Sequence, residues 1–227
     1  MAMVPFARLS RMWRRRPVRV GVGDGYAQWA PVYPAHAHNP VMEAEASRMR
    51  PMMHAASPRR ALDVGTGTGR NLAMLTAAGA RFVTGIDMSN AMLSCGVATY
   101  PRVRGDALQL PFRSAAFDVV CSSLMCGDIP DIGSWLAEAS RVVCNGGHVI
   151  YSDFHPSWSE SGWRRIFRGA DGGSYELPLC AHTVEEHLEQ IDRHGLDVLA
   201  VHEPCVPGGS KPVVTVFYTV KRGGRAR

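Results

Sequence analysis

The sequence predicts an α/β protein built on a parallel sheet. From residue 60 onward, short apolar runs rich in β-branched residues alternate with Ala- and Leu-rich runs of helical character, which is the pattern of consecutive βαβ units. The first strand runs into a glycine-rich turn and then a helix, as in sheets that bind a ligand at their carboxyl edge. With 227 residues, of which 46% are hydrophobic and 20% charged, the chain is expected to form one domain around a packed core.

The turn residues between these runs define the individual elements. Thr183 is expected to open a helix that extends to His194, because Glu186 three residues later completes a capping box. Asn145-Gly146-Gly147 is expected to end the preceding helix with a left-handed turn. The strands are expected over Ala61–Val64, Phe82–Ile86, Val103–Gly105, Phe117–Cys121, His148–Asp153, Leu196–His202 and Val213–Val220, and the other helices over Arg70–Ala78, Asn90–Tyr100 and Ile132–Val143.

The segment before the core is interpreted as a helical lid. It is rich in Ala, Met, His and Pro, and Met42–Arg50 is a run of good helix formers. Tyr26, Trp29 and Tyr33 recur at three- and four-residue spacing, so they share one aromatic helical face. That face either packs on the core or closes the mouth of a binding cleft, and the two roles are compatible.

The positive charge of the chain is concentrated at its two ends. The net charge is +5, but residues 1–23 hold six arginines and no acid, and residues 221–227 add four further positive charges. The body between them carries a net charge of −5, which argues against a nucleic-acid partner. Residues 1–23 are expected to be a disordered basic extension. No apolar run approaches the roughly 20 residues that a membrane span needs.

The six cysteines include no C-x-x-C pair, and several lie inside apolar runs such as VVCSSLMC. They are expected to be reduced and buried thiols in a cytoplasmic protein, because disulfides persist in oxidising compartments. Neither a disulfide nor a metal site is predicted.

The strongest local signal is the run ALDVGTGTGR at residues 61–70. Gly65 and Gly67 stand where a ligand would lie against the main chain, and the helix that follows offers free N–H groups to an anionic group. The dinucleotide fingerprint G-x-G-x-x-G/A does not fit, because the third glycine, Gly69, comes one residue early and Arg70 takes the fingerprint position. Arg70 would obstruct the close helix–strand packing that the fingerprint needs.

Acidic residues end or interrupt the first three strands. Asp87 comes 22 residues after Gly65, where a carboxylate can accept hydrogen bonds from both ribose hydroxyls, and Met88 would then lie against the adenine. Asp106 follows the third strand and could accept from the adenine amino group. Asp63 is buried in the first strand, where it must accept hydrogen bonds, so it is assigned to ordering the glycine turn and to the cofactor's amino group, either directly or through water.

These motifs resemble the class I S-adenosylmethionine-dependent methyltransferases, and among them the small-molecule subset that includes ubiquinone/menaquinone C-methyltransferases and natural-product enzymes. The resemblance covers residues 60–153 and includes GDALQLPF, AFDVVCSSL and RVVCNGGHVIYSDF. It implies a doubly wound, mostly parallel, seven-stranded sheet with an antiparallel last strand, and a tyrosine that closes over the methionine end of S-adenosylmethionine. The expected cofactor residues are Tyr33, Asp63, Gly65, Thr66, Gly67, Asp87, Met88, Asp106, Ala107 and Ser122.

The resemblance favours methyl transfer to O, N or C of a small, apolar or aromatic acceptor. The chain lacks the Asn/Asp-Pro-Pro-Tyr/Phe segment with which nucleic-acid and glutamine N-methyltransferases hold an amino group, and residues 121–124 read CSSL instead. An RNA or protein methyltransferase is therefore disfavoured. A protein that keeps the cofactor and uses its sulfonium to assist a rearrangement or cyclisation stays open, because no unmistakable base is present. The oligomeric state is not predicted.

Three histidines are candidate catalytic bases. His155 follows the fifth strand, at the edge where open α/β sheets place ligands, although it could simply cap a loop beside Pro156. His36 and His38 lie near the expected lid, where a surface-loop role is the alternative.

Trp158, Trp163 and Phe167 follow the fifth strand, where they could wall a substrate pocket or pack in the core. The domain, residues 24–220, is therefore divided into a lid (24–58), a cofactor-binding core (59–154), a substrate-pocket insertion (155–182) and a C-terminal helix and hairpin (183–220).

Overall fold

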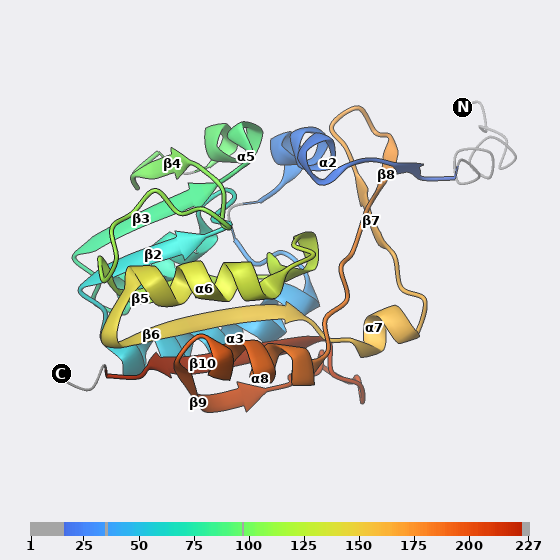
Figure 1. Ribbon diagram of the computed structural model, residues 1–227. Coiled ribbons are helices and arrows are strands. Elements are labelled where there is room, and N and C mark those ends of the chain that lie inside the picture. Colours follow the sequence, from blue (N-terminus) through green and yellow to red (C-terminus); the bar gives the residue numbers. More distant parts are fainter. Residues whose placement is uncertain (1–15, 35, 97, 224–227) are drawn as a thin grey trace, which may run out of the picture.

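The computed structural model describes residues 16–34, 36–96 and 98–223 and contains a seven-stranded sheet (Figure 1). Only β10 runs against its neighbours, pairing antiparallel with both β6 and β9, so the predicted fold class is confirmed. The strands in spatial order are β4 (Arg102–Arg104), β3 (Phe82–Asp87), β2 (Arg60–Val64), β5 (Phe117–Ser122), β6 (Val143–Phe154), β10 (Val214–Lys221) and β9 (Leu196–His202).

The strand order reverses beside β2. The chain runs outward from β2 to β3 and β4 and then returns to place β5 on the other side of β2. Connections on the two sides of such a switch point lead away from each other, so a crevice opens at the carboxyl ends of β2 and β5. The glycine turn follows β2 directly and therefore lies at this crevice.

Helices cover both faces of the sheet (Figure 1). Helices α6 (Ile132–Val142) and α8 (Val184–Arg193) pack on one face with Leu62, Val64 and Val120. Helices α3 (Pro40–Ala56) and α4 (Arg70–Ala77) pack on the other face with Ala61 and Val119. Successive strand residues thus enter opposite clusters, which explains why the central strands read as continuous apolar runs.

Only part of the N-terminal segment lies at the cavity, so the predicted lid is confined to that part. Helix α2 (Val22–Trp29) carries Tyr26 and Trp29 of the predicted aromatic face, and Tyr33 directly follows the 3-10 turn η1 (Ala30–Val32). Helix α3, by contrast, is core: Met49 and Met53 are fully buried against the sheet. The sequence predicts a helical run only over Met42–Arg50, because the next residue, Pro51, is a residue that usually ends or kinks a helix. In the structure Pro51 lies inside α3.

The insertion forms a second, small sheet that the sequence did not predict. Strands β7 (Arg165–Arg168) and β8 (Ser174–Leu177) pair antiparallel, and β1 (Val18–Arg19) adds parallel to β8. A short helix, α7 (Ser157–Glu160), precedes this hairpin. Residues 16–23, expected within a disordered extension, thus contain β1 and the start of α2, and that expectation is wrong for them. Residues 1–15 lie outside the described residues.

Two predicted helix ends are corrected. Helix α5 (Asn90–Cys95) ends well before Tyr100, and Gly96 after it is extended. Helix α6 ends at Val142 and passes directly into β6, so Asn145-Gly146-Gly147 lies inside the strand. Gly146 has a positive φ of 74°, beside a register shift in the pairing of β6 with β5, so the glycines serve a bulge.

Within the described part of the chain, no helix is both long and apolar enough to cross a membrane. All six cysteines are free thiols. Cys121 and Cys126 are buried as predicted, whereas Cys95 and Cys205 are exposed. The capping box at Thr183 is confirmed, with the Thr183 backbone N–H donating to Glu186 and the Glu186 N–H donating to Thr183.

Candidate cofactor and acceptor site

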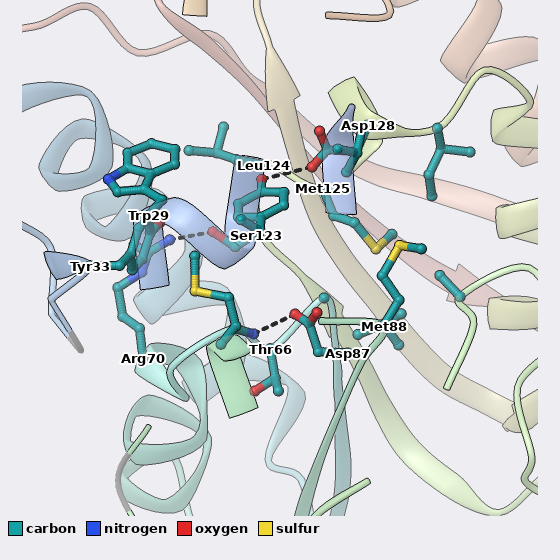
Figure 2. Close-up of a pocket in the computed structure, with 18 of the residues that line it drawn as sticks. Trp29, Tyr33, Thr66, Arg70, Asp87, Met88, Ser123, Leu124, Met125 and Asp128 are labelled. Atoms are coloured by element: carbon teal, nitrogen blue, oxygen red, sulfur yellow. Dashed lines mark hydrogen bonds between the residues drawn. The ribbon is translucent and has the colours of Figure 1, made fainter. Parts of the chain in front are cut away.

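A cavity of about 540 Å³ lies at the carboxyl edge of the sheet, with Trp29 of α2 and Tyr33 on one side of it (Figure 2). It is lined from the ends of β2, β3 and β5, from the N-terminal segment and from the insertion. Among the predicted cofactor residues, those that line it are Tyr33, Gly65, Thr66, Gly67, Asp87, Met88, Asp106 and Ala107.

The glycine turn has the backbone that the sequence indicates, since Gly65, Gly67 and Gly69 all have positive φ. A Cβ on Gly67 would meet nothing within 4 Å, so the space beside it is open to a ligand. A Cβ on Gly65 would lie 2.8 Å from Met125 Cγ. Gly65 is therefore required by packing against the protein itself, as well as by its backbone conformation.

Asp87 ends β3 and closes the turn from the side. Its Oδ2 accepts from the Gly67 N–H at 2.7 Å, and its Oδ1 accepts from the Ser89 N–H at 2.8 Å. Burial raises the pKa of Asp87, while these two backbone donors lower it. Each carboxylate oxygen can accept a second hydrogen bond, so the orientation suits a ribose diol.

The residues expected at the adenine lie further along the same edge. Met88 is 59% exposed although it lines the cavity, which leaves its side chain free to cover a planar ring. Asp106 accepts from the Leu108 N–H at 2.9 Å, which fixes the carboxylate at the cavity wall beside Ala107.

A buried ion pair forms the opposite side of the cavity. Arg70 Nη2 donates to Glu45 Oε2 at 2.8 Å, and Glu45 is fully buried on α3. Ser123 and Ser152 both donate to Glu45 Oε1, and Arg70 also donates to Ser123. Arg70 Nη1 is buried without a partner in the described part of the chain, so it can donate to an anionic ligand group. Figure 2 shows Arg70 and Tyr33 on one side of the cavity, with Asp87 and Met88 on the other.

Two predicted cofactor residues do not line the cavity. Asp63 is fully buried below the glycine turn, where Asn71 Nδ2 donates to its Oδ1 at 3.0 Å. This is consistent with a role in ordering the turn; Asp63 does not line the cavity, and its contact with the cofactor's amino group, directly or through water, stays a prediction. Ser122 is the buried last residue of β5, and Ser123, directly after the strand, lines the cavity in its place.

Of the three predicted catalytic histidines, one lines the cavity and two do not. His38 lines the cavity and packs edge-on against Tyr33. His36 is exposed and does not line it. His155 does not line it either: its Nδ1 accepts from the Ser157 N–H, and its Nε2 lies 2.9 Å from Glu203 Oε1. His155 therefore caps the loop before α7, which was the alternative role.

The aromatic side chains behave as a lid and a wall. Tyr26, Trp29 and Tyr33 all line the cavity, and Trp29 stacks on Phe167 with ring centroids 4.6 Å apart. Phe167 itself does not line the cavity. Lining from the insertion side comes from Phe154, Trp158, Trp163, Arg165 and Ile166.

Sequence reasoning missed three charged residues. These are Glu45, Asp128 and Arg165. In the sequence, Glu45 is one of several helix-forming residues in MEAEASRMR. Asp128 lies in the turn η2 (Cys126–Asp128) after β5, and Arg165 lies in the insertion hairpin. Each has its ionic partner far away in the chain, so no local spacing marks it. The described residues contain no cluster of His, Cys, Asp or Glu that could hold a metal ion.

Comparison with known proteins agrees with this geometry. Residues 62–151 match the family model described as "Methyltransferase domain", which is less than half of the chain. An S-adenosylmethionine-dependent methyltransferase from Mesorhizobium loti superposes with a TM-score of 0.64 at 21% identity, covering 78% of this chain and 98% of that one. At this identity the likeness shows the fold. The resemblance to class I methyltransferases is thereby confirmed.

Two curated relatives are methyltransferases by name. The phthiotriol/phenolphthiotriol dimycocerosates methyltransferase of Mycobacterium leprae is 34% identical over 152 residues, 61% of this chain and 56% of the relative. The demethylmenaquinone methyltransferase of Mycolicibacterium vanbaalenii is 35% identical over 96 residues, 42% of each chain. The chain thus spans about half the length of the curated relatives it matches.

Replacing Asp87 by Asn should weaken the binding of S-adenosylhomocysteine by about 10- to 100-fold, because one charge-assisted acceptor for the ribose is lost. Isothermal titration calorimetry measures the change. Asp118→Asn is the matched control: Asp118 also accepts two backbone N–H bonds, from Arg59 and Arg60, but does not line the cavity. Equal affinities for wild type and Asp87→Asn would contradict the ribose assignment.

Asp63 should make the cofactor-free fold less stable at neutral than at acidic pH. Burial raises its pKa from 3.8 to about 6, so the folded state holds this proton more tightly than the unfolded state. The resulting stabilisation is full below about pH 4 and is lost as the pH rises through 6. Urea unfolding at pH 5 and pH 7 should therefore show wild type losing stability relative to Asp63→Asn at the higher pH. A constant difference between the two proteins would refute the raised pKa.

Proposed function

We propose that this chain transfers a methyl group from S-adenosylmethionine to O, N or C of a small, largely apolar or aromatic acceptor. The observation that carries the proposal is one continuous cavity that joins the glycine turn and Asp87 to the aromatic wall of the insertion. Cofactor and acceptor sites in the same cavity let a nucleophile be aligned with the methyl group.

The residues present fit the cofactor. Open space beside Gly67, the Asp87 carboxylate and the unpartnered Arg70 Nη1 match a nucleoside with an amino-acid side arm. When bound, S-adenosylmethionine supplies an electrophilic methyl group through its sulfonium. The remaining work of the chain is to orient the acceptor and exclude water, for which the aromatic lid of Trp29 and Tyr33 is placed above the cavity.

The acceptor side favours a flat apolar molecule. Trp158 and Trp163 lie edge-to-face with centroids 4.3 Å apart, and Phe154 lies 5.3 Å from Trp163. The acidic body of the chain and the CSSL segment speak against a nucleic-acid acceptor. The relatives are named for two different substrates, so they do not choose among acceptors.

Incubation of the chain with trideuteromethyl-labelled cofactor and a panel of phenolic, enolic and amine acceptors should give products heavier by one labelled methyl, detected by mass spectrometry. The Asp87→Asn variant should lose this product at limiting cofactor. Conversion of an acceptor without gain of the label would instead identify the cofactor-retaining rearrangement or cyclisation, and the transfer proposal would fail.

The lid should respond to the methionine end of the cofactor. Hydrogen exchange over residues 22–34 should slow when S-adenosylhomocysteine binds, more than in β9 and β10, because closure orders the backbone of α2 and η1. Adenosine, which lacks the amino-acid arm, should protect this segment less. Equal exchange with and without ligand would mean that α2 only packs against the core and does not close over the cofactor.

A further inference from the structure

A second buried ion pair lies in the cavity wall, away from the glycine turn. Asp128 ends η2, just after β5, and Arg165 begins β7 of the insertion. Arg165 Nη2 donates to Asp128 Oδ1, and the Tyr26 hydroxyl of α2 donates to Asp128 Oδ2 at 2.8 Å. All three residues line the cavity, and Figure 2 shows Asp128 well apart from Thr66 and Asp87.

Both members of the pair are nearly inaccessible to solvent, with side chains 6% and 11% exposed for Arg165 and Asp128. Arg165 Nη2 also donates to the Pro178 carbonyl at 2.7 Å, whereas Nε has no partner in the described part of the chain. Burial raises the pKa of Asp128 although Arg165 lowers it. An apolar pair of similar size could hold the insertion to α2 as well, so stability does not explain two buried charges beside a cavity.

The charges select the kind of group that can approach them. A permanent anion would be attracted by Arg165 but repelled by Asp128. A cation would be attracted by Asp128 but repelled by Arg165. A neutral hydroxyl satisfies both residues, because its hydrogen can be donated to Asp128 while its oxygen accepts from Arg165. The neighbouring Trp158 and Trp163 supply a surface for the flat body that carries such a hydroxyl.

We infer that the Arg165–Asp128 pair is the acceptor-recognition site of this cavity and binds an ionisable hydroxyl, a phenol or an enol, on an aromatic acceptor. This inference rests on the proposed methyl transfer and names the acceptor class for it. In the transfer, the hydroxyl proton moves to Asp128, and the oxygen or its conjugated carbon uses the freed electron pair to bond the methyl carbon. The electrons of the broken carbon–sulfur bond stay on sulfur, while Arg165 balances the charge on the acceptor oxygen until the bond forms.

The experiment measures binding rather than turnover, so that it does not depend on knowing the natural acceptor. Equilibrium dialysis in saturating S-adenosylhomocysteine compares 2-naphthol with 2-methoxynaphthalene, which has the same ring but no hydrogen to donate. Wild type should bind 2-naphthol about 10- to 100-fold more tightly, as expected for a hydrogen bond to a charged group. Naphthalene-2-carboxylate should bind more weakly than 2-naphthol.

The test variant is Asp128→Asn/Arg165→Met, which removes both charges together and leaves no unpaired buried ion. It should reduce the preference for 2-naphthol by about tenfold or more while keeping S-adenosylhomocysteine affinity. The matched control is Glu176→Gln/Arg164→Met, because Arg164 and Glu176 form an ion pair in the same hairpin but do not line the cavity. The control should keep the wild-type preference.

Equal binding of 2-naphthol and its methyl ether by wild type would overturn the inference without any variant. So would an unchanged preference in the Asp128/Arg165 double variant, or tighter binding of the carboxylate. Each of these results leaves the cofactor site intact, whereas failure of wild type to bind S-adenosylhomocysteine would refute the proposed function itself.

Discussion

The fully buried carboxylate of Glu45 is the constraint on which the architecture of the site depends. A charge removed from water must be satisfied by the protein, and Glu45 is satisfied by three elements at once: Arg70 of α4, Ser123 after β5 and Ser152 of β6. These contacts fix α3 against the sheet directly below the cavity. They also hold Arg70 at the cavity wall, where its Nη1 has no partner among the described residues, so the structural ion pair leaves a donor that suits a ligand.

The cavity is bounded by two ion pairs with different origins. The Arg70–Glu45 pair belongs to the core helices, whereas the Arg165–Asp128 pair joins the insertion to the turn after β5. Tyr26 links the second pair to the lid through Asp128, and Tyr33 closes the side near the first. The N-terminal segment therefore contacts both halves of the cavity, the half with the glycine turn and the half with the second ion pair.

The sequence predicted what is encoded locally. Alternating apolar runs, the glycine turn and acids at strand ends predicted the fold and most of the candidate cofactor residues that line the cavity, because these features depend on spacing within one or two elements. It did not predict the β1–β8 pairing, which joins residues more than 150 positions apart, or the partners of Glu45 and Asp128. The sequence pattern of a strand predicts that its side chains alternate between the two faces of the sheet, but only the fold decides which residue meets the cavity. For this reason Ser122 was predicted, whereas Ser123 lines the cavity.

The site residues that the sequence predicted and those that it did not predict lie in different parts of the chain. The segment that matches the methyltransferase model ends at residue 151, and Trp158, Trp163 and Arg165 all follow it, while Tyr26 precedes it. Only Asp128, among the residues that meet at the second ion pair, lies inside the matched segment. The matched core carries the candidate cofactor residues from Gly65 to Ala107, whereas most of the residues proposed to contact the acceptor come from segments outside it.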